Sequence, residues 1–281
     1  MSTVYLNGEY LPKDRATISV DDRGFLLSDG IYEVTSAYRG RLFRMEQHMC
    51  RLRKGLDALR IEYDLAELPE MHASLIAANT LDVEDVAIVY LQITRGAAPR
   101  THHFPPEGTP PTVYAFAQVC HRPESARWER GYEAITVPDR RWARVDIKSI
   151  SLLPNVLAQQ AAVDQGVSDA LLVRDGVALE GSHNNVFAVF DGVVTTHPAT
   201  HQILQGVARE YVIELAREQG IQVEERPVSL EEMRAADEIF FTGTTTEVRP
   251  TVRLDDQPVG SGKVGPVAKA LYGAFKAGTQ A

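Results

Sequence analysis

The sequence predicts an α+β protein of two domains, each built on a largely antiparallel sheet. Short segments rich in β-branched and aromatic residues alternate with segments of helical period. Neighbouring strand segments are joined by two-residue turns such as Asn7-Gly8, which favour antiparallel pairing. The chain of 281 residues is long enough for two modest domains, and its 44% hydrophobic residues suffice for their cores.

The first half predicts a hairpin, then a strand pair, then helices and two further strands. The strand before Arg39-Gly40 places Tyr32 and Val34 on one face and Glu33 on the other. A helix follows, because Met45, Met49, Leu52, Leu56 and Leu59 recur at spacings of four and three. The remaining elements are strands over 4–6, 9–11, 86–94 and 112–120, a helix over 69–80, and a loop over 95–106 rich in glycine, proline and cationic residues.

A polar segment without a strong period, 121–130, is the predicted linker between an N-terminal domain (1–120) and a larger C-terminal domain (131–281) that carries Lys148. The turns Asp175-Gly176 and Asp191-Gly192 predict two hairpins in this second half. The predicted elements are extended segments over 132–137, 146–151, 170–173, 177–180, 186–190, 193–195, 221–224 and 238–242, and helices over 155–165, 206–218 and 267–275.

The composition excludes several classes of function. A net charge of −9 and a pI near 5.4 argue against a basic surface for nucleic acid or anionic membranes. No apolar run reaches the length of a membrane span, and the first residues lack a secretory pattern. Cys50 and Cys120 have neither disulfide-framework nor zinc spacing. We therefore expect a cytoplasmic protein.

Two motif matches carry no chemistry, and a third motif is missing. The Gly-x-Gly-x-x-Gly spacing over 260–265 is followed by only 16 residues, none of them acidic, so it lacks the context of a dinucleotide site. His102 and His103 have no further histidine or carboxylate at ligand spacing, so no metal is expected there. No Gly-x-Ser-x-Gly segment marks a serine hydrolase.

Lys148 is the first residue with a chemical interpretation. Only six of the 29 basic residues are lysines, and Lys148 alone lies in an apolar extended stretch. An amine in an apolar site loses its proton more readily, because burial disfavours the ammonium. A neutral amine can form a Schiff base with a carbonyl compound. A lysine at the edge of a sheet remains the alternative explanation.

A carboxylate and several anion-binding segments complete the set. Glu180 ends a strand before Gly181-Ser182, where a fixed carboxylate can keep a pyridine nitrogen protonated. Gly206 opens a helix whose first N–H groups can bind a phosphate. The threonine-rich stretch 242–246 adds hydroxyls, and Arg51 lies beside the apolar stripe of its helix. Each feature alone is more typical of a turn, a helix cap or a surface cation.

Their order along the chain resembles one known family. The segments are Tyr32-Glu33, 48–52, Arg95-Gly96, Lys148-Ser149, Glu180-Gly181-Ser182, 185–187, Leu204-Gln205-Gly206 and 242–245. From about Tyr5 to Lys269 the chain is similar to the fold-type IV pyridoxal-phosphate enzymes. The resemblance implies two domains with pyridoxal 5'-phosphate in the cleft between them. It implies that Lys148 binds the cofactor covalently, with Arg51, Glu180, Ser182, Leu204, Gly206, Val207, Ala208, Gly243 and Thr244 as further cofactor-binding residues.

Within this family the chain is most similar to members that act on D-amino acids. The similarity lies in Thr94-Arg95-Gly96 and in 100–102. It implies that Arg100, His102 and Tyr32 bind the substrate carboxylate, which suits the bidentate guanidinium. It also implies that the Arg100–His102 loop reaches the neighbouring subunit's site in a homodimer. The expected reaction is transamination between a D-amino acid such as D-alanine and a 2-oxo acid such as 2-oxoglutarate, with Lys148 carrying the 1,3-proton transfer.

The sequence also departs from these relatives and leaves alternatives open. Val207-Ala208 stands where they often have threonine, Gly243 where serine is common, and His183-Asn184 where they have small hydroxyl residues. The alternatives with the same cofactor are a branched-chain L-amino-acid aminotransferase, an (R)-amine transaminase and an aminodeoxychorismate lyase. A non-catalytic binding protein of this fold and a metal hydrolase using His102 and His103 are the alternatives from other classes.

Overall fold

The chain forms two compact units in a computed structural model that describes residues 2–280. The first unit holds the described residues up to Arg122 together with Ile147–Ser151. The second holds Pro123–Asp146 and the described residues from Leu152 onward. Each unit combines helices with one sheet, which confirms the predicted α+β class. None of the helices within 2–280 is long and apolar enough to span a membrane.

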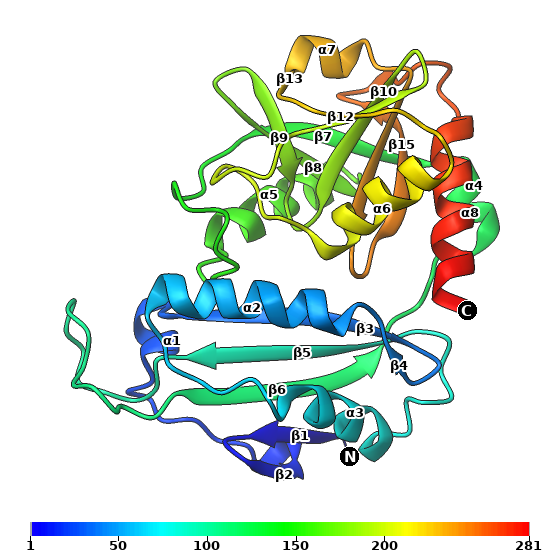
Figure 1. Ribbon diagram of the computed structural model, residues 1–281. Coiled ribbons are helices and arrows are strands. Elements are labelled where there is room, and N and C mark those ends of the chain that lie inside the picture. The colour runs from blue at the N-terminus through cyan, green and yellow to red at the C-terminus, as the bar shows by residue number, and fades with distance from the viewer. Residues whose placement is uncertain (1, 281) are drawn as a thin grey trace. The chain divides into compact units, whose positions relative to one another are not determined.

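The first unit is a six-stranded antiparallel sheet with helices on it (Figure 1). The strand order is β2-β1-β6-β5-β3-β4. Asn7 and Gly8 both have positive φ, as the predicted turn between β1 and β2 requires. The elements are β1 (Thr3–Leu6), β2 (Glu9–Pro12), η1 (Lys13–Arg15), α1 (Arg23–Leu27), β3 (Gly30–Tyr38), β4 (Arg41–Leu42), α2 (Met45–Leu59), α3 (Leu68–Ala78), β5 (Ala87–Thr94) and β6 (Thr112–Val119).

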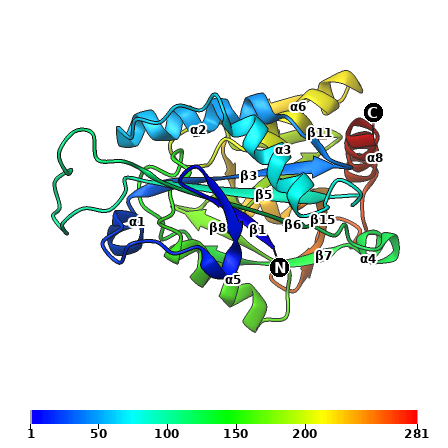
Figure 2. The ribbon, with the colours of Figure 1, turned by 90° about the horizontal axis from the view of Figure 1, so that it is seen from below.

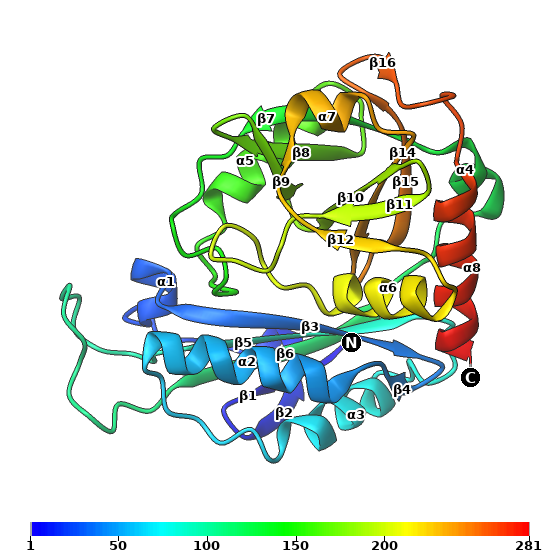
Figure 3. The same cartoon turned by 45° about the horizontal axis from the view of Figure 1, so that its top comes forward.

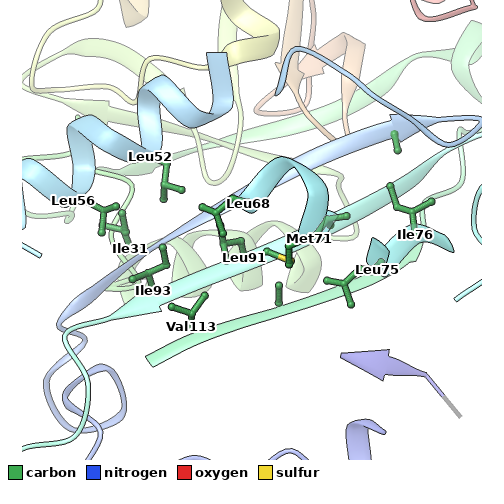
Figure 4. Close-up of a cluster of buried hydrophobic side chains, with 14 of the residues drawn as sticks. Ile31, Leu52, Leu56, Leu68, Met71, Leu75, Ile76, Leu91, Ile93 and Val113 are labelled. Atoms are coloured by element: carbon green, nitrogen blue, oxygen red, sulfur yellow. The ribbon is translucent and has the colours of Figure 1, made fainter. Parts of the chain in front are cut away.

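Helices α2 and α3 bury their apolar stripes on one face of this sheet (Figures 2 and 4). Ile31 pairs with Ile93, and Ile93 pairs with Val113, so one row of side chains crosses three strands. Leu52 and Leu56 of α2 pack on this row, as the predicted stripe requires. The side chains of Tyr32 and Val34 lie on the opposite face of β3.

His72 of α3 is a buried polar residue in this core. Its Nδ1 lies 2.7 Å from the carbonyl oxygen of Leu68, and burial lowers its pKa to about 4. In the unfolded chain the His72 imidazole takes up a proton near pH 6.5, whereas in the folded chain it does so only near pH 4. The free energy of unfolding therefore falls as the pH drops from 6.5 to 4. The loss attributable to His72 is about 3 kcal/mol.

We expect this part of the acid sensitivity to disappear in His72→Leu. Urea unfolding between pH 7 and pH 4 measures it, with His103→Gln, an exposed histidine, as the control. An equally steep loss of stability in His72→Leu and in the wild type would contradict the assignment.

The second unit is a ten-stranded mixed sheet of order β12-β11-β10-β14-β15-β7-β8-β9-β13, with β16 paired to β15. The pairs β11–β12, β15–β7 and β7–β8 are parallel and the others are antiparallel. The elements are α4 (Ser125–Arg130), β7 (Tyr132–Pro138), α5 (Leu153–Asp164), β8 (Asp169–Arg174), β9 (Val177–Gly181), β10 (Asn185–Phe190), β11 (Val193–Thr196), α6 (Val207–Glu218), β12 (Val223–Glu225), β13 (Val228–Ser229), α7 (Leu230–Arg234), β14 (Glu238–Gly243), β15 (Glu247–Leu254), β16 (Gln257–Pro258) and α8 (Pro266–Gln280).

The helices of the second unit pack on its sheet through their apolar faces. Helix α5 packs on β7 and β8, whereas α6 and α8 contact each other and pack on β14 and β15 (Figure 3). Val212 and Leu215 of α6 are buried, which agrees with the predicted amphipathic helix. This packing fixes the position of the N-terminus of α6 relative to the strand ends beside it.

The structure differs from the sequence prediction at several places. The expected linker contains a helix, α4, which belongs to the second unit. The segment 146–151 is irregular, with a single bridge between Ser149 and Ile31. That bridge groups Ile147–Ser151 with the first unit, although Lys148 was expected in the C-terminal domain. Strand β15 was not predicted, because Arg249, Pro250 and Arg253 lower its strand propensity.

Candidate active site

Lys148 is held against the edge of the first sheet by backbone hydrogen bonds. The N–H of Tyr32 donates to the carbonyl of Lys148 at 3.0 Å, and the N–H of Ile150 donates to Gly30 at 3.1 Å. Ile147 beside it is buried in the core of the first unit. The backbone is therefore fixed on both sides of the lysine.

The phenol ring of Tyr32 lies directly beside the lysine amine. The Lys148 Nζ is 4.1 Å from the centroid of this ring. Tyr90 of β5 stacks on Tyr32 at 5.7 Å between centroids, and Phe116 of β6 stacks on Tyr90 at 5.1 Å. These aromatic contacts orient Tyr32, so the structure brings together two residues that the sequence predicted separately.

Arg51 is bound by a buried carboxylate in the same unit. Its Nε and Nη2 lie 3.0 and 2.5 Å from the two oxygens of Glu33, and His48 Nδ1 lies 3.0 Å from Glu33 Oε1. Burial by itself raises the pKa of Glu33, but Arg51 and His48 outweigh it and hold this pKa well below its usual range. Burial lowers the pKa of His48 despite that carboxylate. The predicted phosphate ligand Arg51 is thus oriented by Glu33.

The loop over 95–111 is anchored at its base. The Arg95 guanidinium donates to both oxygens of Asp29, at 2.8 and 3.0 Å, and to the carbonyl of Leu59 at 2.7 Å. The ring of Phe104 covers this guanidinium, with 3.8 Å between the Arg95 Cζ and the ring centroid. The start of the loop and its middle are therefore tied to one buried cation.

A second arginine fixes the segment that carries the predicted substrate ligands. Arg23 donates to Asp29 at 2.8 Å and to the carbonyl of Thr101 at 2.9 Å. The side chains of Arg100 and His102, on either side of Thr101, are exposed. The loop thus has a fixed backbone and presents these two side chains to solvent.

Glu180 lies at the end of β9 in the second unit and is only 4% exposed. Its Oε2 accepts hydrogen bonds from Asn185 Nδ2 at 2.8 Å and from the N–H of Leu204 at 3.1 Å. Its Oε1 accepts from Nη1 of Arg141. Burial raises the pKa of the Glu180 carboxyl, and the Arg141 guanidinium opposes that rise. The structure therefore places a buried, oriented carboxylate where the sequence predicted one.

Sequence reasoning missed the arginine behind Glu180. Arg141 donates from Nε and Nη2 to the two oxygens of Asp139, at 2.9 and 3.1 Å. Arg174 contacts Asp139 at 2.8 Å and donates to the Arg141 carbonyl at 3.0 Å. Asp139 and Arg141 lie in the stretch 138–141, which ends seven residues before Lys148. No periodicity of this stretch indicated that the two residues are buried.

The N-terminus of α6 lies next to Glu180. The amide of Asn185 donates both to Glu180 and to the Leu204 carbonyl, at 2.8 Å each. A Cβ on Gly206 would lie 2.1 Å from Asn185 Oδ1, so only glycine fits there. The N–H groups of Val207 and Ala208 open the helix and have no acceptor within it. The first N–H groups of α6 and a buried carboxylate thus lie side by side.

The end of β14 adds hydroxyl groups to this region. Thr242 pairs with Asn185 across β10 and β14. Within the described part of the chain, the hydroxyls of Thr242 and Thr246 are buried and have no hydrogen-bond partner. Gly243 and Thr244 are half-buried beside them. Unpartnered buried hydroxyls at a strand end are suited to a polar ligand.

Ser182 makes hydrogen bonds within the second unit. Its hydroxyl donates to Gln159 Oε1 at 2.6 Å and lies 2.8 Å from Nδ1 of His183. The Asn155 amide donates to the Ser182 carbonyl at 2.7 Å. These contacts fix the turn that follows Glu180.

The donor set of the second unit fits pyridoxal phosphate. The cofactor needs an acidic partner for its ring nitrogen and N–H or O–H donors for its phosphate. Glu180 has three donors on a carboxylate that offers about four acceptor positions, so one position remains for the ring nitrogen. Gly206 and the unpartnered hydroxyls of Thr242 and Thr246 supply the surroundings of a phosphate.

Comparison with known proteins identifies the family. The family described as amino-transferase class IV matches residues 30–254. The chain is 37% identical to the D-alanine aminotransferase of Staphylococcus haemolyticus over 277 residues, 98% of this chain and 97% of that protein. It is 37% identical to the Bacillus licheniformis D-alanine aminotransferase over 273 residues, 97% and 95% of the two chains. The protein belongs to the class IV aminotransferases, as its motif order predicted.

Solved structures of the family share the fold. The branched-chain amino acid aminotransferase of Escherichia coli superposes with a TM-score of 0.90 at 28% identity, covering 98% of this chain and 94% of that chain. A second branched-chain enzyme, from T.th. and solved with pyridoxamine 5'-phosphate, has a TM-score of 0.90 at 26% identity, with 99% and 94% coverage. The predicted fold-type IV architecture is thereby confirmed.

Proposed function

We propose that this protein is a pyridoxal-phosphate-dependent aminotransferase that moves the amino group of a D-amino acid such as D-alanine to a 2-oxo acid such as 2-oxoglutarate. The observation that carries the proposal is the 36–37% identity to D-alanine aminotransferases over nearly the whole of both chains. Identity to the branched-chain enzymes is lower, at 26–28%. The exposed Arg100–His102 loop supports a substrate with a carboxylate. The cytoplasmic location stays a prediction.

The cofactor-binding residues take distinct roles in this proposal. Lys148 Nζ would hold the cofactor covalently, and once free as an amine it would accept the Cα proton of the substrate and return it. Glu180 keeps the ring nitrogen protonated, so that the bound ring withdraws electrons from Cα. The phosphate is held by Arg51, by the N–H groups that follow Gly206, and by Thr244. Leu204 orients Glu180 through its N–H, Ser182 fixes the adjoining turn, and Gly243 leaves room beside Thr246.

Substrate recognition rests on three residues of the first unit. Arg100 offers two parallel N–H donors to the substrate carboxylate, and His102 and Tyr32 add further donors. The anchored base of the loop fixes the backbone on which Arg100 and His102 stand. A rigid loop loses little conformational freedom when it binds a ligand.

We further propose a homodimer in which this loop completes the neighbouring subunit's site. Helix α5 carries the feature that favours a dimer. Leu153, Val156 and Leu157 lie on one face of this helix and are 68%, 59% and 62% exposed. Exposed apolar side chains that cluster on a helix indicate a protein interface. A twofold dimer buries this face in both copies at once.

The test of the proposed reaction follows the visible absorption band of the protein loaded with pyridoxal phosphate. Addition of D-alanine is expected to bleach the band and release pyruvate, and addition of 2-oxoglutarate is expected to restore it. L-leucine is expected to leave the band unchanged. Bleaching by L-leucine alone would replace the proposed substrate by a branched-chain L-amino acid. The absence of a visible band would contradict the cofactor assignment.

Arg100→Ala should raise KM for D-alanine at least about a hundredfold, because a bidentate charged contact is lost. The cofactor band should remain. An exchanged equimolar mixture of Arg100→Ala with Lys148→Ala should regain about a quarter of wild-type activity, since half of the dimers are mixed and each holds one complete site.

The matched control for this mixture is Lys148→Ala with Glu180→Gln. Both residues are proposed to serve the same site from one subunit, so no mixed dimer contains a complete site and no activity should return. No recovery in the Arg100→Ala mixture would show that the loop serves its own subunit. Recovery in the control would show that Lys148 and Glu180 of one site come from different subunits.

A further inference from the structure

Three buried or half-buried charges lie behind Glu180, the buried carboxylate of the second unit. Arg141 stands between Asp139 and Glu180, and the side chains of Arg141 and Asp139 are 6% and 0% exposed. Asp139 is also paired with Arg174 at 2.8 Å. Two guanidinium groups thus neutralise two carboxylates.

The two edges of the Arg141 guanidinium bind different carboxylates. Nε and Nη2 bind Asp139 in a bidentate fork, and the backbone N–H of Arg141 adds a third bond to Asp139 at 3.0 Å. The remaining nitrogen, Nη1, donates to Glu180. Arg174 fixes the Arg141 backbone through its carbonyl. Asp139 and Arg174 therefore orient a guanidinium whose free edge faces Glu180.

A guanidinium beside Glu180 affects whether a proton shared between this carboxylate and an aromatic nitrogen lies on one or the other. A carboxylate and an aromatic nitrogen in contact compete for one proton, and the more basic group takes it. A neighbouring cation stabilises the ionised carboxylate and so weakens its hold on the proton. A buried carboxylate without such a cation favours the protonated form, because its charge is poorly solvated.

We propose that Arg141 is a positioning residue that keeps Glu180 ionised when the cofactor is bound and thereby leaves the shared proton on the ring nitrogen. This inference rests on the proposed function, in which Glu180 contacts that nitrogen. Asp139 holds Arg141 in the orientation that this role requires. Removing Arg141 transfers the proton to Glu180 and leaves the ring nitrogen neutral.

The experiment uses pyridoxal phosphate labelled with 15N in the ring, bound to the protein, and reads the ring-nitrogen chemical shift at pH 7.5. This shift distinguishes a protonated from a neutral nitrogen without any turnover. The wild type is expected to show the protonated shift, and Arg141→Met the neutral shift. Arg141→Lys, which restores a cation, is expected to return toward the wild type. Arg140→Met removes an exposed neighbouring arginine and is the control without effect.

Kinetics supply an independent readout. Arg141→Met should lower kcat at least about tenfold, the effect of one pKa unit on the protonated fraction, and leave KM for D-alanine within about twofold. A protonated shift in folded Arg141→Met overturns the inference. If Arg141→Met does not fold, Arg141→Gln decides, because a side chain that can still hydrogen bond but carries no charge must also move the shift toward the neutral value.

Failure of the proposed function gives different results. A wild-type protein that does not bind the labelled cofactor contradicts the cofactor assignment. A wild type with a neutral ring nitrogen contradicts the role of Glu180, and the inference falls with it. A protonated wild type with an unchanged Arg141→Met leaves the proposed function intact and removes only the role of Arg141.

Discussion

Lys148→Ala is expected to abolish transamination, with a loss of about a thousandfold or more in kcat. The variant lacks both the amine that binds the cofactor and the group that carries the Cα proton. The backbone of this segment is fixed by hydrogen bonds of Tyr32 and Ile150, and neither bond involves the lysine side chain. The fold should therefore be preserved, and the loss should be chemical.

Borohydride reduction followed by peptide mass analysis tests this expectation. Reduction should attach the cofactor to Lys148 in the wild type and to no residue in Lys148→Ala. Lys54→Ala, which removes an exposed lysine from α2, is the matched control and should keep both activity and attachment. Wild-type transamination by Lys148→Ala would end the proposed mechanism, and attachment to another lysine would reassign it.

Glu180→Gln should lower kcat roughly a hundredfold or more, the scale at which single electrostatic groups act in active sites. The amide keeps the shape of the side chain but lacks the charge that holds a proton on the ring nitrogen. The cofactor should stay attached to Lys148. Removing the charge also takes away one of the two anionic partners of the Arg141 guanidinium, so the free energy of unfolding is measured beside kcat.

A second buried carboxylate separates the loss of catalysis from the loss of stability. Glu238 is 7% exposed and accepts hydrogen bonds from the N–H groups of Val267 and Ala268 at the start of α8. Glu238→Gln should destabilise the protein and leave kcat and the 15N shift unchanged. Equal losses of kcat in the two variants, assayed below both melting temperatures, would show that Glu180 acts only through stability.

The residues proposed for catalysis are divided between the two units. The first unit supplies Lys148, Arg51 and the anchored loop. The second supplies Glu180 and the N-terminus of α6, joined by Asn185. The proposed acceptor for the ring nitrogen and the proposed phosphate-binding helix end therefore depend on the packing of one unit.

The sequence by itself determined the elements whose causes are local. The Asn7-Gly8 turn follows from two residues that accept positive φ, and α2 follows from a stripe of apolar side chains. The order of motifs from Tyr32 to Thr244 also determined the family, because these residues sit at turns and strand ends where the chemistry requires particular side chains. The site assignments built on that order stay predictions until the variants are measured.

Only the tertiary structure decided which charges meet. Arg51 and Glu33 are 18 residues apart, and Arg141 and Glu180 are 39 apart, yet both pairs are buried contacts. The irregular backbone at Lys148 and the central place of β15 were likewise beyond local propensity. Burial makes an unpaired charge costly, so each such charge needs a partner, and that partner is supplied by whichever segment the fold brings beside it. No spacing along the chain encodes that choice, because it depends on the packing of sheets and helices that are distant in sequence.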